Sequence, residues 1–249
     1  MGFKASLIKK LPKSIQQPLR RWYYFRLLTS FEKTPEMHFL GSLIKKGDLV
    51  VDVGANIGVF TKHLSELVGP TGKVVSIEPI PSTFDLLRWN VRALKLKNVE
   101  LFPYAVSTEN GEVEMMIPSY QTGGDDFYRA KIIEKGGNQK TMKIPSKTLD
   151  SLLEKYGSKI TFMKIDVEFH ESETIQGAQN VIKNSMPILL VEVTRDPEDV
   201  APGAFPIFNF LKSLGYQAFW FSETGLKKYY PGQYPPNVES VNYFFMPPS

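Results

Sequence analysis

The sequence predicts an α/β protein built on a doubly wound, mostly parallel sheet of the Rossmann-like type. Short apolar runs of strand length alternate with segments whose apolar residues recur at helical spacing. A glycine-bearing turn, Gly54–Gly58, joins the first such run to the first helical segment. Two aromatic-rich runs near the C-terminus, residues 217–221 and 241–245, have no convincing helix between them and predict a closing antiparallel pair.

The first half of this alternation is regular. The run 49–53 is a buried strand, and a helix opening at Ile57 is ended by Gly69. A second strand ends at Pro79, and Ser82 with Asp85 predicts a capping box for the next helix. Residues 99–106 form the third strand. Strand–helix–strand units of this length imply parallel neighbours joined by right-handed crossovers.

The second half contains an insertion at residues 107–150, where loop residues replace the regular pattern. Asn110-Gly111 predicts a hairpin that joins Val106 to the strand 112–116. Strands then return at 160–167 and 187–193. We expect a basic, aromatic N-terminal arm over residues 1–45 and one domain over residues 46–249, whose insertion supplies substrate-side loops.

The composition excludes several kinds of functional site. The chain has 249 residues, 42% apolar and 22% charged, and no cysteine, which excludes disulfides, thiolate metal sites and a cysteine nucleophile. No run of about 18 apolar residues is present, and no signal peptide is recognised, so a cytoplasmic protein is expected.

Positive charge is concentrated in the N-terminal arm. Seven Lys and Arg residues precede the first acid, Glu32, and the rest of the chain has 23 basic and 26 acidic residues. A nucleic-acid partner is therefore not expected. We expect the apolar side of the arm to pack on the domain. In the alternative, residues 1–30 contact a membrane surface or another protein.

The glycine-bearing turn distinguishes between two classes of cofactor. A dinucleotide requires G-x-G-x-x-G, whose middle glycine lets the backbone approach the pyrophosphate. Here Gly54-Ala55-Asn56-Ile57-Gly58 has Asn56 at that position. S-adenosylmethionine has no phosphate, and its methionine part can be bound by the loop amides, a helix N-terminus and the acceptor Asp52. An NAD-dependent dehydrogenase remains the alternative enzyme.

Glu78 ends the second strand, where a carboxylate can accept hydrogen bonds from both ribose hydroxyls of a bound nucleoside. This position suits S-adenosylmethionine and NAD equally. Glu78 therefore supports a nucleoside cofactor without choosing between them.

The fourth strand brings Asp166, Glu168 and His170 to the carboxyl edge of the sheet. Strand alternation places Asp166 and Glu168 on one face, and His170 joins them if the chain stays extended. Glu168 or His170 is the expected base for a hydroxyl acceptor. In the alternative, these three residues and Glu192 form a Mg²⁺ site. His38 and His63 are expected to be structural, with His63 on the polar side of its helix.

Several blocks in order resemble the FkbM family of methyltransferases. They are residues 51–58, Ile77-Glu78-Pro79, 98–100 leading to Ala105-Val106-Ser107, 147–152 and 164–168, within a stretch from about Gly47 to Val193. The resemblance implies a class I methyltransferase sheet of seven strands with the last antiparallel. It also implies S-adenosylmethionine bound by the Asp52–Gly58 loop and Glu78, with Pro79, Ala105 and Val106 as further contacts.

The implied reaction is O-methylation of a hydroxyl on a sugar, polyketide or related small molecule. One departure is Phe169, which stands where the family usually has glycine. A bulky ring there is expected to reshape the substrate side of the pocket or to require a different backbone. The alternative from another functional class is a scaffold that binds the cofactor without turnover.

Overall fold

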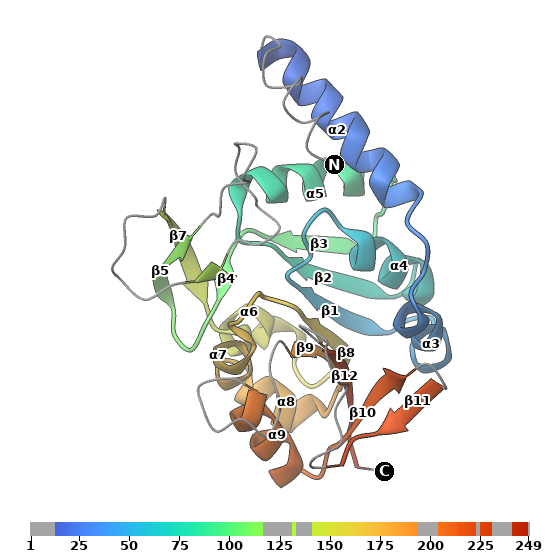
Figure 1. Ribbon diagram of the computed structural model, residues 1–249, viewed down its shortest axis with the longest axis vertical. Helices are drawn as coiled ribbons and strands as arrows, with labels where there is room; N and C mark the ends of the chain where they lie inside the picture. The colour runs from blue at the N-terminus through green and yellow to red at the C-terminus, as the bar shows by residue number, and fades with distance from the viewer. Residues whose placement is uncertain are drawn as a thin grey trace.

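The computed structural model describes residues 13–116, 131–132, 141–193, 204–222, 225–230 and 241–248. Residues 1–12 of the arm and the glycine-rich parts of the insertion lie outside the described residues. The described chain confirms the α/β class, with a mostly parallel sheet covered by helices on both faces (Figure 1).

The main sheet has eight strands in the order β11-β10-β12-β9-β8-β1-β2-β3. Five strands are parallel to one another, namely β3, β2, β1, β8 and β9. β12 is antiparallel to both of its neighbours, β9 and β10, and its pairing with β10 is the antiparallel pair predicted near the C-terminus. The eighth strand, β11, was not expected and forms a hairpin with β10. The bounds are β1 Leu49–Val53, β2 Lys73–Ile77, β3 Val99–Phe102, β8 Ile160–Ile165, β9 Ile188–Val193, β10 Gln217–Ser222, β11 Gly225–Lys228 and β12 Val241–Met246.

Alternate residues of the buried strands face two separate cores. Val50, Val74 and Phe162 pack with α3 and α4, whereas Val51, Val75 and Met163 pack with α6, α8 and α9. Both faces are apolar because helices cover both, as is usual for parallel sheets. The helices are α2 Lys13–Thr29, α3 Pro35–Leu43, α4 Val59–Val68, α5 Pro81–Ala93, α6 Leu149–Leu153, α7 Glu171–Gln176, α8 Gln179–Ser185 and α9 Ala204–Ser213.

The insertion builds a second, smaller sheet beside the carboxyl edge of the main one. Its order is β4-β7-β5-β6, from Ala105–Val106, Thr141–Lys147, Gly111–Met116 and Lys131–Ile132. The predicted hairpin at Asn110-Gly111 is wrong, because β7 lies between β4 and β5 and pairs with both. The Asn110 side chain instead accepts hydrogen bonds from the Thr148 amide and the Ser151 hydroxyl.

Three local expectations require correction. The third strand is two strands, β3 and β4, which belong to different sheets on either side of Pro103. The Ser82 capping box is absent, because Pro81 begins α5 and Ser82 provides no cap. His63 is buried rather than on a polar face, and its Nε2 lies 2.7 Å from the carbonyl oxygen of Met37, which connects α4 to α3.

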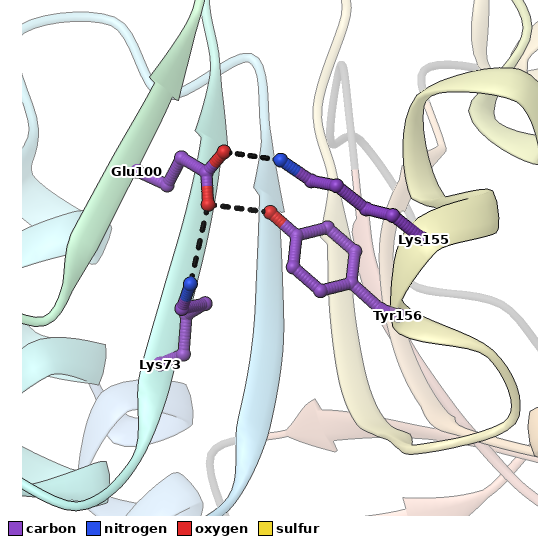
Figure 2. Close-up of polar contacts among 4 residues, drawn as sticks. All are labelled: Lys73, Glu100, Lys155 and Tyr156. Carbon is purple, nitrogen blue, oxygen red and sulfur yellow. Dashed lines mark hydrogen bonds and ion pairs between the residues drawn. The ribbon is translucent and has the colours of Figure 1, made fainter.

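A polar cluster fastens the edge strand β3 to the short 3₁₀ turn Glu154–Tyr156 (Figure 2). The Glu100 carboxylate accepts hydrogen bonds from the Lys155 ammonium, from the Tyr156 hydroxyl at 2.8 Å and from Lys73 at 3.3 Å. Burial opposes ionisation, but these donors together lower the pKa of Glu100 to about 2. The cluster is far from the glycine-bearing turn in sequence and serves the packing of this edge.

Helix α2 lies against α5, where Phe25 meets the ring of Trp89 at 5.5 Å between centroids. Figure 1 shows its N-terminal half extending beyond the rest of the described fold. Among the described residues, no helix is both long and apolar enough to cross a membrane.

Candidate active site

The glycine-bearing turn follows β1 and carries three residues with positive φ: Gly54 at 78°, Asn56 at 51° and Gly58 at 99°. A Cβ on Gly54 would stand 1.7 Å from the carbonyl oxygen of Asp166, so this glycine is required by the close approach of the chain after β8. The requirement arises from packing between two strand ends. It is independent of any ligand.

The amides of this turn are mostly engaged within the protein. Gly54 and Ala55 both donate to the carbonyl of Ile77, at 3.0 and 2.9 Å, and Gly58 donates to Ala55. The Asn56 amide donates to Oε2 of Glu78 at 3.0 Å. The expectation that exposed loop amides receive the cofactor is therefore not met at these four positions.

Glu78 follows β2 and joins the turn to the start of α5. Its Oε1 accepts from the Ile80 amide at 2.9 Å, and its Oε2 accepts from Asn56. Burial raises the pKa of this carboxyl to about 7, against the lowering effect of these amide donors, and the charges of Asp52 and Asp166 raise it further. Each oxygen keeps acceptor capacity, since an ionised carboxylate offers about four lone-pair sites.

A cavity of about 380 Å³ opens beside Glu78. One wall comes from the carboxyl ends of β1, β2, β8 and β9, and the other from the small sheet through Met115 and Ile132. Its size falls within the usual range of ligand pockets. The lining residues are Val53, Gly54, Asn56, Ile77, Glu78, Pro79, Ile80, Tyr104, Ala105, Val106, Met115, Ile132, Asp166, Val167, Glu168 and Glu192.

Six of the nine residues expected to bind the cofactor line this cavity: Gly54, Asn56, Glu78, Pro79, Ala105 and Val106. Ala55 and Gly58 belong to the turn but are not in the lining. Asp52 is fully buried behind it, where its Oδ2 accepts from the Thr61 hydroxyl at 2.6 Å. Asp52 therefore connects β1 to α4 in this structure.

Lys164 is a buried lysine that pairs with one of the carboxylates on the cavity wall. Lys164 lies opposite Asp52 in the register of β1 and β8, and its ammonium is 2.8 Å from Oδ2 of Asp166. Burial alone would raise the pKa of Asp166, but Lys164 and a hydrogen bond with Glu192 lower it. Asp166 is therefore an ionised acceptor on the cavity wall at neutral pH.

The chain after Asp166 does not continue as a strand, because β8 ends at Ile165 and both Glu168 and Phe169 have positive φ, at 54° and 70°. Glu168 lines the cavity, whereas His170 is not among its lining residues. The Nε2 of His170 lies 3.1 Å from the Ser107 hydroxyl, and its Nδ1 lies 3.5 Å from Glu173. The extension expected to bring His170 beside Glu168 is thus absent.

Phe169 keeps the left-handed backbone that glycine adopts readily, and the residue is 50% exposed. It does not belong to the cavity lining. The ring therefore does not shape the wall of this cavity, and the expected change of backbone is not seen either.

Sequence reasoning missed several residues of this region. Tyr104 lines the cavity from the connection between β3 and β4, and Met115 and Ile132 line it because the insertion folds back over the sheet edge. No local pattern singles out these three side chains. Glu171 is buried behind the site and accepts from the Val167 amide at 3.2 Å. Lys164 could have been found from the sequence, because a lysine inside an apolar strand requires a buried anion beside it.

The hydrogen-bond acceptors of the cavity suit a ligand with positive charge and hydroxyl groups. Four carboxylates line it, from Glu78, Asp166, Glu168 and Glu192, and the Asn56 Oδ1 is buried with no partner among the described residues. The described residues contain no group of three or more His, Cys, Asp or Glu that could hold a metal ion.

Comparison with protein families gives a match over residues 52–218, about two thirds of the chain, to the methyltransferase FkbM domain. The hexuronic acid methyltransferase AglP of Haloferax volcanii is 28% identical over 159 residues, 63% of this chain and 61% of that protein. A protein-L-isoaspartate O-methyltransferase of Archaeoglobus fulgidus is 40% identical over 58 residues, 23% of this chain. The chain thus spans less than two thirds of either relative, and only 26% of the second.

Among solved structures, methyltransferase FkbM from Methylobacillus flagellatus aligns with a TM-score of 0.56 at 17% identity. The alignment covers 97% of this chain and 57% of that one. At this level of identity the likeness concerns the fold, and it agrees with the Rossmann-like sheet described above.

Proposed function

The chain belongs to the FkbM family of S-adenosylmethionine-dependent methyltransferases, and from that premise we propose that it methylates a hydroxyl oxygen of a sugar or a related small molecule. The observation that supports this best is the carboxylate-lined cavity between the sheet edge and the small sheet. The relative AglP, named as a hexuronic acid methyltransferase, supports a sugar-like acceptor.

In this proposal, Glu78 holds the ribose of the cofactor through hydroxyl donors that complement its two oxygens. Asn56 contributes its unpaired Oδ1, and the carboxylates of the lining favour the cationic sulfonium and ammonium groups. S-adenosylmethionine supplies an electrophilic methyl group when bound. Everything else in the reaction is alignment of the acceptor oxygen and removal of its proton.

We assign proton removal to Glu168, which lines the cavity. Asp166 is less suited, because the lowered pKa that Lys164 imposes makes it a weak base and a good fixed acceptor. The acceptor hydroxyl forms its new bond to the methyl carbon as the carbon–sulfur bond breaks, and its proton passes to the base. We assign His170 a positioning role, in which its contact with the Ser107 hydroxyl holds the chain that follows Val106 of the cavity lining.

The test begins with calorimetric titration of S-adenosylmethionine, S-adenosylhomocysteine and NAD into the wild type and Glu78→Ala. Micromolar binding of the first two, no binding of NAD and clear weakening in the variant are expected. Glu100→Ala serves as the control, because it removes a carboxylate that lies outside the cavity lining. Tight NAD binding, or no binding of any of the three, would contradict the cofactor assignment.

Acceptor panels then address the chemistry. Neutral sugars, uronic acids and hydroxylated polyketides are incubated with methyl-labelled cofactor, and labelled products are treated with mild base. A methyl ether survives this treatment, whereas a methyl ester is hydrolysed. Label retained on a hydroxylated acceptor supports O-methylation of a hydroxyl, and base-labile label would show a carboxyl acceptor instead.

A further inference from the structure

Helix α2 combines positive charge with exposed apolar side chains. Its sequence contains Lys13, Arg20, Arg21 and Arg26 and no acidic residue. Seven Lys and Arg residues in all precede the first acid of the chain, Glu32. A surface of this composition complements an anionic partner.

The exposed apolar side chains lie on one side of the helix. Ile15 is 50% exposed and Trp22 is 58% exposed, and their spacing of seven residues places them two turns apart on the same face. Arg26, one turn further on, has its guanidinium 5.6 Å from the centre of the Trp22 ring. Tyr23, beside Trp22, is also exposed.

Another side of α2 packs against the protein body. Leu28 is buried in a cluster with Ile57 and Leu86, and Phe25 meets Trp89 of α5. The helix is therefore held in place, with Ile15 and Trp22 directed away from the fold. Because the body side already holds the buried residues, the outer aromatic and aliphatic side chains contribute nothing to the described core.

We propose that the outer face of α2, defined by Ile15, Trp22 and Arg26, docks on a membrane surface that contains anionic lipids, with the exposed Arg21 about a quarter turn away as a further cation. Tryptophan beside arginine suits the headgroup region, where the ring enters the interface and the guanidinium meets phosphate. The exposed Trp22 and Ile15 favour a lipid surface over a purely polar polyanion, which would leave these side chains in water. This inference does not depend on the methyltransferase activity.

The experiment is co-sedimentation of the full chain with vesicles of phosphatidylcholine, with and without phosphatidylserine. Binding is expected only to the anionic vesicles. It should fall strongly when NaCl rises from about 0.1 M to about 1 M, which shortens the Debye length from about 10 Å to about 3 Å. The fluorescence of Trp22, isolated by comparison with Trp22→Ser, should shift to the blue on binding.

Two variants test the face itself. Arg21→Ala with Arg26→Ala is expected to weaken the partition coefficient by about fivefold per arginine, or roughly 25-fold together. Trp22→Ser is expected to weaken it by roughly tenfold. S-adenosylhomocysteine binding and the melting temperature should not change in either variant.

A matched control exists at the far edge of the sheet. Lys227 and Lys228 are exposed cations next to the exposed ring of Tyr230. Lys227→Ala with Lys228→Ala, and Tyr230→Ser, should leave vesicle binding unchanged. Equal losses in the two sets, indifference to phosphatidylserine, or binding to a homopolymeric RNA without binding to vesicles would each overturn the proposal.

Discussion

The ammonium of Lys164 lies 2.8 Å from Oδ2 of Asp166, so a buried lysine is paired with a carboxylate on the wall of the cavity. The side chain of Lys164 is 4% exposed and also faces Asp52 across β1 and β8. The attraction of Asp166 and Asp52 outweighs the effect of burial, and the pKa of Lys164 is raised. The ion pair is therefore present throughout the neutral range.

Lys164→Met is expected to lower the free energy of unfolding by about 3–5 kcal/mol, because it leaves Asp166 and Asp52 without their buried cation. Adding Asp166→Asn should restore part of the loss, since one of these anions is then neutral. Urea unfolding at neutral pH measures both. Lys62→Met is the control, because its pair with Glu66 is exposed and is worth less than about 1 kcal/mol. A loss in Lys164→Met no larger than in the control would contradict the prediction.

Gly54→Ala is expected to destabilise the protein by several kcal/mol and to abolish S-adenosylhomocysteine binding. The new Cβ would meet the Asp166 carbonyl at 1.7 Å, and only movement of the backbone can relieve this contact. Gly157→Ala is the matched control, since Gly157 also has positive φ but no neighbour within 4 Å of the added carbon. It should cost only the backbone strain, about 1–3 kcal/mol. Equal costs in thermal unfolding would show that the close approach is unimportant.

Phe169→Gly is expected to be more stable than Phe169→Ala by about 1 kcal/mol, because φ at this position is 70° and alanine bears a Cβ penalty there. The usual order of these two residues in regular structure is the reverse. Both variants should bind S-adenosylhomocysteine as the wild type does, because Phe169 is outside the cavity lining. Denaturant midpoints decide the order, and a more stable alanine variant would refute the argument.

The affinity for S-adenosylhomocysteine is expected to rise with pH and to level off above about pH 7. Burial raises the pKa of Glu78 to about 7, so the carboxyl is neutral below that pH and accepts two ribose hydroxyls best above it. Below the pKa, the dissociation constant should change by up to about tenfold per pH unit. Calorimetry across this range measures the slope.

Glu171 provides the control for this pH dependence, because its pKa is also raised to about 7 and it does not line the cavity. Glu78→Gln should remove the slope, whereas Glu171→Gln should leave it. If the pH dependence of the affinity disappears in Glu171→Gln instead, Glu171 and not Glu78 is the group that titrates.

The same shift has a consequence for folding. The folded-state pKa of Glu78 lies above its ordinary value of 4.5, so the folded protein binds this proton more tightly than the unfolded chain does. The stabilisation that results is complete below about pH 4.5. It is lost as pH rises through about 7.

The sequence alone predicted the alternation of strands and helices in the main sheet and the two positions on which the site depends. Apolar runs that alternate with helical periodicity bury their surface in a parallel sheet covered by helices, and parallel strands bring their carboxyl ends to one edge. Gly54 follows β1 and Glu78 follows the neighbouring strand β2, so the turn and the carboxylate meet at this edge, where the Asn56 amide donates to Glu78. These inferences need only local pattern and a rule of topology.

Which side chains share the cavity depends on long-range packing. Met115 and Ile132 reach it because β7 pairs with both β4 and β5, a long-range pairing that Asn110-Gly111 did not indicate. His170 is absent from the lining because the chain turns through the positive φ values of Glu168 and Phe169, which strand alternation cannot anticipate. A lysine inside an apolar strand indicates a buried anion, but only the folded structure shows that Asp166 and Asp52 are the carboxylates beside Lys164. Burial and the choice of partner are properties of the whole fold, and for that reason the chemistry of these residues could not be read from their neighbours in sequence.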